Sequence, residues 1–248
     1  MNRILIGIDD TDIIGSRGTG FLSRQLAAEL EKNKLGIISG ITRHQLLIHP
    51  DIPYTSQNSS ACLMIQSNEV EAIKEFAANY LKKNCPKGSD AGLCILPNEI
   101  ILDDIIDFGL SAKTRVLKMK DAYQLAEKNG IYLEGFLGSK QGIIGALAAI
   151  GLRISGNDGR FIWLKGVKEL RELKPEIFLA SELKRLLSLD SIGTFEDIQA
   201  NDNERILGSD WIRPVIKDNK TILIVEKSKN NINYEWEVAS KDFIRKHS

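Results

Sequence analysis

Three aspartates, Asp9, Asp10 and Asp12, stand within four residues of each other, directly after the apolar run "ILIGI". Carboxylates this close repel one another and destabilise the fold unless a positive charge lies among them. Mg²⁺ suits such a place, because proteins bind it with one or two carboxylates together with phosphate oxygens. We therefore predict that the three aspartates bind Mg²⁺ and are catalytic. In an extended chain the side chains of Asp10 and Asp12 would lie on one face of the strand and that of Asp9 on the opposite face.

A glycine-rich loop, "GSRGTG" over residues 15–20, follows the aspartates and leads into a predicted helix. Glycines let backbone N–H groups approach a phosphate, and the N-terminus of a helix favours an anion. The combination predicts a metal-nucleotide site with contacts from Gly15, Gly18, Thr19 and Gly20. The structural alternative is an acidic turn that only caps the helix.

A polar segment, "TRHQLLIHPDIPYTSQNSSA" over residues 42–61, contains two further candidates. Arg43 could clamp a phosphate or a carboxylate, and Asn58 lies among small polar side chains that could shape a pocket. The alternative is an exposed, proline-rich loop. His44 and His49 are too few for a convincing metal site, and either could be a satisfied strand residue. The polar neighbours are Tyr54, Thr55, Ser56, Ser59 and Ser60.

A second glycine loop, "GSKQG" over residues 138–142, precedes a helix of small residues. Gly138, Ser139 and Gly142 could offer backbone N–H groups to an anion, and Lys140 a positive charge. The alternative is tight helix packing through small residues. Both can hold, because the loop and the helix face are separate surfaces. The small residues are Gly142, Gly145, Ala146 and Ala149.

Several familiar motifs do not fit. A Walker A loop needs Gly-Lys-Ser/Thr, but Gly20 is followed by Phe21 and Leu22. An EF-hand loop begun at Asp10 would have Phe21 where a glutamate is needed. The sequence "DTDI" after an apolar strand comes close to the haloacid-dehalogenase pattern. In that alternative, a phosphatase that needs no ATP, Asp10 would be the nucleophile and Asp12 the acid/base.

Strand and helix patterns alternate along the chain. This alternation predicts an α/β or α+β fold with layered packing. Open α/β folds bind ligands at the carboxyl ends of their strands, which is where the aspartates stand. Helices are predicted at 20–33, 68–84 and 120–130, with a short one within 98–110. Strands are predicted at 3–9, 61–67, 91–97, 112–119, 220–227 and 232–239.

The composition is that of a soluble globular protein, with 43% hydrophobic and 27% charged residues among 248. Lys+Arg and Asp+Glu balance at 33 each, whereas a dedicated nucleic-acid binder usually has a basic excess. Three cysteines without a Cys-x-x-Cys pair argue against a zinc ribbon and a disulfide framework. We see no signal peptide and no membrane-spanning run. We expect a cytoplasmic protein without membrane contact that could form a homodimer.

Three blocks in this order, "GIDDTD", "HPDIPYTSQNSSA" and "GSKQGIIGALAAIG", resemble the archaeal isoleucine-tRNA agmatinylcytidine synthetases over roughly residues 1–165. That family uses ATP to activate a wobble cytidine and then attaches agmatine. The resemblance implies ATP and Mg²⁺ as cofactors, with Asp9, Asp10 and Asp12 around the metal and phosphates. It also implies that Gly138 to Gly142 and Asn58 lie at the same site. Thr19 would stand for a threonine that the family uses in its kinase chemistry.

The family combines a kinase-like and a ferredoxin-like domain. The resemblance therefore implies a kinase-like, ATP-binding domain from 1–60 and 112–170, a ferredoxin-like lobe from 61–111, and an extension of unknown role from 171–248. The family's OB-fold and zinc ribbon, which grip tRNA, are not recognised here, so we expect a stand-alone relative of the catalytic core.

The expected function is that of an ATP- and Mg²⁺-dependent enzyme of the kinase or ligase type. It would activate a substrate oxygen by phosphoryl or adenylyl transfer, and an amine could then displace the activated group. A small molecule or a tRNA would be the substrate. Two alternatives stay open: the phosphatase, and a nucleotide- or RNA-binding module without turnover.

Overall fold

A computed structural model describes residues 2–55, 57–98, 100–165, 170, 173–229 and 232–246 of the chain. Two compact units are present, Met1–Ser155 and Gly156–Ser248. Within the described residues, no helix is both long enough and apolar enough to cross a membrane.

An antiparallel sheet in the order β5-β4-β1-β3-β2 forms the centre of the first unit. Ile4, Leu5, Ile6 and Ile8 of β1 are all fully buried. β1 is covered on both faces, and for that reason its sequence is a continuous apolar run rather than an alternating one. The strands are β1 (Asn2–Asp9), β2 (Ile37–Gln45), β3 (Ser59–Ser67), β4 (Gly92–Leu96) and β5 (Tyr132–Gly135).

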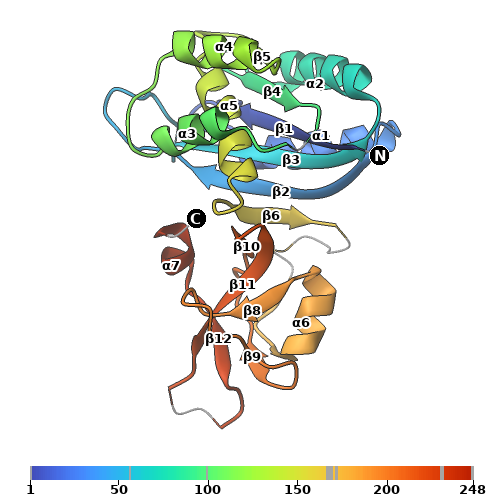
Figure 1. Ribbon diagram of the computed structural model, residues 1–248, viewed down its shortest axis with the longest axis vertical. Coiled ribbons are helices and arrows are strands. Elements are labelled where there is room, and N and C mark those ends of the chain that lie inside the picture. The colour runs from blue at the N-terminus through green and yellow to red at the C-terminus, as the bar shows by residue number, and fades with distance from the viewer. Residues whose placement is uncertain are drawn as a thin grey trace. The chain divides into compact units, whose positions relative to one another are not determined.

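Helices cover both faces of this sheet (Figure 1). On one face α5 (Gly142–Ile154) crosses β1, β3 and β4, and α3 and α4 pack against it. On the other face α1 packs against β2 and β3, beside α2. These layers of helix and sheet confirm the predicted α/β class. The remaining helices are α1 (Thr19–Lys32), α2 (Val70–Asn84), α3 (Asp103–Ser111) and α4 (Met119–Lys128).

Small residues allow α5 to lie very close to the sheet. A Cβ added at Gly7 of β1 would come within 2.1 Å of the Ala146 carbonyl oxygen, and one at Gly92 of β4 within 2.1 Å of the Gly142 carbonyl carbon. A Cβ at Gly145 would come within 1.7 Å of the Asp9 carboxylate. The predicted tight packing of this helix is therefore confirmed.

The strand predicted over residues 112–119 is wrong. The backbone N–H groups of Ala112 and Arg115 bond to the carbonyl oxygens of Phe108 and Ser111, at the end of α3. The last carbonyls of a helix lack partners within it, so these local bonds compete successfully with a strand ladder. The chain therefore turns after α3, and α4 begins at Met119.

The segments predicted as separate domains share one sheet. β4 and nearly all of β3 come from residues 61–111; the two strands flank β1, and α5 packs across all three. The chain divides into compact units after Ser155, whereas the resemblance implies divisions after residues 60, 111 and 170. The assignment of kinase-like and ferredoxin-like parts stays a prediction.

The second unit contains a mixed sheet in the order β6-β10-β11-β12-β9-β7, with β8 parallel to β11. Its core contains Val215, Ile222, Ile224, Ala239 and Ile244. The strand predicted at 220–227 is confirmed as β11, and the strand predicted at 232–239 is reduced to β12. The elements are β6 (Arg160–Leu164), β7 (Ile177–Leu179), α6 (Ala180–Leu187), β8 (Ser191–Gly193), β9 (Arg205–Leu207), β10 (Val215–Lys217), β11 (Lys220–Lys227), β12 (Trp236–Val238) and α7 (Lys241–Lys246).

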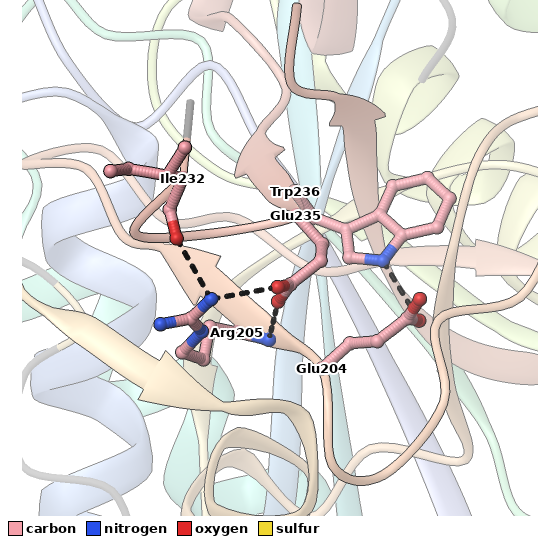
Figure 2. Close-up of polar contacts among 5 residues, drawn as sticks. All are labelled: Glu204, Arg205, Ile232, Glu235 and Trp236. Atoms are coloured by element: carbon pink, nitrogen blue, oxygen red, sulfur yellow. Dashed lines mark hydrogen bonds and ion pairs between the residues drawn. The ribbon is translucent and has the colours of Figure 1, made fainter. Parts of the chain in front are cut away.

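Two glutamates connect β9 to the segment that enters β12 (Figure 2). The backbone N–H of Arg205 donates to Glu235 at 2.6 Å, and its Nη2 donates to the other Glu235 oxygen at 2.9 Å. The Trp236 Nε1 donates to Glu204 at 3.0 Å. The hydrogen bond from Arg205 is the main reason why the pKa of Glu235 is lowered. These contacts align the two short strands.

Candidate active site

Strand ends from the centre of the first sheet meet at the three aspartates. Asp9, the last residue of β1, pairs with Gly92 at the start of β4, which in turn pairs with Gly135 at the end of β5. The start of α5 joins them, because the Gly142 N–H donates to the Asp90 carbonyl at 2.9 Å. Since the strands are antiparallel, the site combines both kinds of strand end. It is not the row of carboxyl ends that a parallel sheet would give.

Asp9 is the innermost of the three carboxylates, with 8% of its surface exposed. Its side chain points to α5, where Gly145 leaves room for the carboxylate. Burial raises the pKa of Asp9 well above its ordinary value, and the charges of Asp10 and Asp12 raise it further, while Arg43 opposes the shift. The shift arises because burial disfavours the charged carboxylate.

Asp10 leaves the extended conformation, with a φ of 55°. The predicted alternation of the three side chains is therefore interrupted at this residue. Burial raises the pKa of Asp10 to about 6, and the nearby charges of Asp90 and Asp12 contribute in the same direction. Within the described residues, no group donates a hydrogen bond to its carboxylate. Asp10 is thus an ionisable group without a compensating partner among the described residues.

Asp12 has the opposite environment, because three groups donate to it. The backbone N–H and the hydroxyl of Thr19 reach one carboxylate oxygen at 3.2 and 3.1 Å. The hydroxyl of Thr55 reaches the other at 2.6 Å. The N-cap of α1 is Gly18, which has no side chain to accept a bond from the first turn. Asp12 takes over that role, so for this aspartate the structure shows the capping arrangement.

The three carboxylates therefore do not converge on one point. Asp9 lies against Gly145 and Asp12 against Thr19 and Thr55. Across the part of the chain that the structure describes, no three or more His, Cys, Asp or Glu side chains are arranged as a metal-binding group. The binding of one Mg²⁺ by all three aspartates stays a prediction.

Replacing Asp12 by alanine should destabilise the protein, because the Thr19 N–H at the start of α1 would lose its acceptor. The expected loss is about 1 kcal/mol of unfolding free energy, as for other helix caps. Asp12→Asn keeps an acceptor oxygen and should lose much less. Urea unfolding of both variants measures the difference. Equal losses in the two variants would show that capping is not the role of Asp12.

The first glycine loop lies at the mouth of α1. Gly15 is exposed with a φ of 87°, and Gly18 and Gly20 flank the start of the helix. Thr19 is buried, and its hydroxyl also accepts a hydrogen bond from Thr11 at 3.1 Å. The backbone N–H of Thr19, which was predicted to face a phosphate, donates a hydrogen bond to Asp12 instead.

The second glycine loop surrounds Asp90, a residue that sequence reasoning missed. A Cβ at Gly138 would come within 2.0 Å of the Asp90 carboxylate, and the Ser139 N–H donates to the same group. The Gly142 N–H bonds to the Asp90 carbonyl, and the Asp90 N–H donates to the Asp10 carbonyl at 3.1 Å. Lys140 is exposed. The position of Asp90, directly before a buried strand and after a Pro-Lys-Gly turn, is the signal that could have found it.

Arg43 and Asn58 both lie near Asp9 in the structure. The Arg43 Nε donates to the Ser59 hydroxyl at 2.8 Å, and its charge lowers the pKa of Asp9. The Asn58 Nδ2 donates to the Leu47 carbonyl at 2.7 Å, which closes the loop between β2 and β3. His44 is fully buried and bonds to the Thr42 hydroxyl, so it is a satisfied strand residue. Ser56 lies outside the described residues.

Asp10 borders two hollows. The smaller has a volume of about 70 Å³, and Asp9, Asn58, Arg115 and Gln141 are among its lining residues. The larger has a volume of about 430 Å³, within the range of ligand pockets. It is lined by Asp10, Asp12, Ile13, Ile14, Pro53, Tyr54, Thr55, Gly88, Ser89 and Asp90. Gln141 belongs to the 138–142 loop that the resemblance places at this site, whereas Arg115 was not predicted, because it is an isolated polar residue far along the sequence from the aspartates.

Two curated relatives are similar in sequence to this chain. An uncharacterized protein of Methanocaldococcus jannaschii is 28% identical over 155 residues, which cover 61% of this chain and 50% of that protein. The isoleucine-tRNA 2-agmatinylcytidine synthetase TiaS of Thermococcus sibiricus is 29% identical over 159 residues, covering 61% of this chain and 35% of the synthetase. The matched part thus spans half or less of each relative. No protein-family model matches the chain.

Solved structures show the same fold. A complex of TiaS with its isoleucine tRNA and ATP is 23% identical, with a TM-score of 0.54 over 61% of this chain and 36% of that one. The tRNA fluorescent labeling enzyme is 24% identical, with a TM-score of 0.53 over 60% of this chain and 36% of that one. Over about three fifths of its length, this chain therefore resembles the catalytic core of TiaS, as its three sequence blocks predict.

Proposed function

We propose that this protein is an ATP-dependent enzyme that activates a substrate oxygen, with Asp10 at the reacting centre. The observation that supports this most is the half-buried Asp10 carboxylate, which borders both hollows and accepts no hydrogen bond from the described residues. A partly buried carboxylate without hydrogen-bond donors is energetically unfavourable, and such groups are typical of functional sites. The relation to TiaS, a tRNA-modifying synthetase solved with ATP, supports ATP as the activating compound.

The residues present fit a divalent cation at Asp10. Burial raises the pKa of Asp10, and repulsion from Asp90 and Asp12 adds to the shift. A bound cation would relieve that repulsion. Mg²⁺ prefers carboxylate and phosphate oxygens, so Asp10 would hold it together with the nucleotide, and Asp9 and Asp12 would add negative charge nearby. When bound, the ion would neutralise charge on the transferring phosphate group.

The reaction would proceed in two steps. A substrate oxygen would attack a phosphorus of ATP and form an activated ester, with ADP released if the terminal phosphoryl moves, or pyrophosphate if the adenylyl group moves. An amine nitrogen could then form a bond to the carbon and release phosphate or AMP. The larger hollow supports an amine as the second substrate: Asp10, Asp12 and Asp90 could attract its charge, and Ile14 and Tyr54 could contact its chain. Agmatine, present in a solved TiaS complex, is an amine of this kind.

The phosphatase alternative gains less support from the site. In that reaction Asp12 must donate a proton. Both carboxylate oxygens of Asp12 already accept hydrogen bonds, from Thr19 at the start of α1 and from Thr55, so Asp12 is held in a capping role.

Consumption of ATP by the pure protein tests the proposal. The protein would be incubated with ATP and Mg²⁺, with and without agmatine or an RNA substrate, and the nucleotide products separated. Formation of ADP or AMP would support the proposal and identify the bond that breaks. A protein that neither binds nor consumes ATP under any of these conditions, but hydrolyses phosphate monoesters, would be the phosphatase instead.

A further inference from the structure

Arg115 is a cation at the candidate site that no sequence pattern indicates. It lies in the turn after α3, where its backbone N–H bonds to the Ser111 carbonyl and its Nη2 donates to the Ser111 hydroxyl at 2.9 Å. A hydrogen bond of 3.0 Å from the Leu47 N–H to the Ala112 carbonyl connects this turn to the loop that contains Asn58. Arg115 is thereby positioned at the smaller hollow, beside Asp9 and Asp10.

Among the described residues that line either hollow, Arg115 is the single lysine or arginine. The two cations that the sequence suggested line neither hollow: Arg43 bonds to Ser59, and Lys140 is exposed on the second glycine loop. The cation that lines the smaller hollow therefore comes from a different segment, the turn after α3.

The guanidinium of Arg115 is not paired with the aspartates. Among the described residues, its side-chain hydrogen bond goes from Nη2 to the Ser111 hydroxyl, and no ion pair joins it to Asp9 or Asp10. A guanidinium has five N–H donors. Arg115 therefore retains donors for a ligand.

The size of the smaller hollow limits what that ligand group can be. Its volume of about 70 Å³ corresponds to the share of roughly two water molecules in the liquid. Such a space suits one tetrahedral oxyanion and excludes a nucleoside. Guanidinium groups bind phosphate oxygens with two parallel hydrogen bonds, which gives both affinity and orientation.

We propose that Arg115 binds a phosphate group of the nucleotide in the smaller hollow and holds it next to Asp10. This inference rests on the proposed use of ATP. It assigns the two hollows different partners: the smaller takes a phosphate of the nucleotide, and the larger takes the second substrate.

Nucleotide affinity of Arg115→Gln tests this assignment. Dissociation constants with Mg²⁺ present would be measured for ATP, ADP, AMP, adenosine and inorganic tripolyphosphate. Loss of a charge-assisted hydrogen bond should weaken the binding of ATP and of tripolyphosphate by about tenfold or more. Adenosine, which has no phosphate, should change less than about twofold. Arg115→Lys should recover part of the lost ATP affinity, because it restores the charge without the fork.

Lys120→Gln is the matched control, since it removes one exposed cation of the same segment that lines neither hollow. It should bind every compound as the wild type does. If Arg115→Gln binds ATP like this control, or loses ATP and adenosine affinity equally, the role of Arg115 is overturned while ATP use stands. If the wild type binds no phosphate compound, both the proposed function and this inference fail. Unfolding curves of the variants check that the fold is intact.

Discussion

The Asp10→Asn protein is expected to consume ATP at least about a hundredfold more slowly than the wild type. Asparagine has nearly the same shape but offers a neutral oxygen, so it can neither neutralise a cation nor accept a proton at pH 7. The rate of ADP or AMP formation at saturating ATP and Mg²⁺ measures the loss.

The same substitution should make the ligand-free protein more stable at pH 7.5. The pKa of Asp10 is raised to about 6 in the folded protein, so folding favours the protonated group. Stability from this residue is fully present below pH 4 and is lost as the pH rises through about 6. Asparagine avoids this loss, and the expected gain at pH 7.5 is about 3 kcal/mol. Urea unfolding without Mg²⁺ at pH 7.5 and pH 4 should show the gain at the first pH and little at the second.

Asp121→Asn is a suitable control, because Asp121 is an exposed residue in the first turn of α4. It should change neither the rate of ATP consumption nor the pH dependence of stability. An Asp10→Asn protein that keeps full activity would remove Asp10 from the reacting centre. A variant that is less stable than the wild type at pH 7.5 would show that the Asp10 carboxylate has a compensating partner after all.

Gly7→Ala should destabilise the first unit by about 3 kcal/mol, the upper range for overpacking of a core. The added Cβ would meet the backbone carbonyl oxygen of Ala146 at 2.1 Å. Backbone atoms cannot turn aside as a flexible side chain can, so α5 would have to move away from β1. Denaturant unfolding measures the loss. ATP consumption should fall as well, because the same movement displaces Gly145 from Asp9.

Gly18→Ala provides the comparison for this substitution. Its nearest neighbour would be the Asp12 carboxylate at 3.9 Å, an ordinary contact, and its φ of −69° suits alanine. A loss below about 1 kcal/mol is expected, from the poorer N-cap alone. If Gly7→Ala were tolerated as well as Gly18→Ala, the close approach of α5 to β1 would not be required for stability.

The sequence by itself determined the elements with strong local patterns. The buried run before Asp9 predicts β1, because a strand covered on both faces is a continuous apolar run. Helical spacing predicts α1 and α2, because a helix buried on one face has apolar residues at a regular period. The turn after α3 was misassigned as a strand, since the hydrogen bonds that end a helix leave no hydrophobic pattern. Asp9, Asp10 and Asp12 were found because they are close neighbours in the sequence itself, and carboxylates at that spacing must repel one another in any fold.

Only the tertiary structure decided what each aspartate does. Burial under α5 raises the pKa of Asp9, while Asp12 accepts hydrogen bonds from two threonines. Asp90 and Arg115 join the site from the start of β4 and the end of α3. The turn before β4 marks Asp90 in the sequence, but no pattern marks Arg115 or places either residue beside the three aspartates. Antiparallel pairing brings the start of one strand to the end of another, so residues far apart in the chain become neighbours only when the sheet forms.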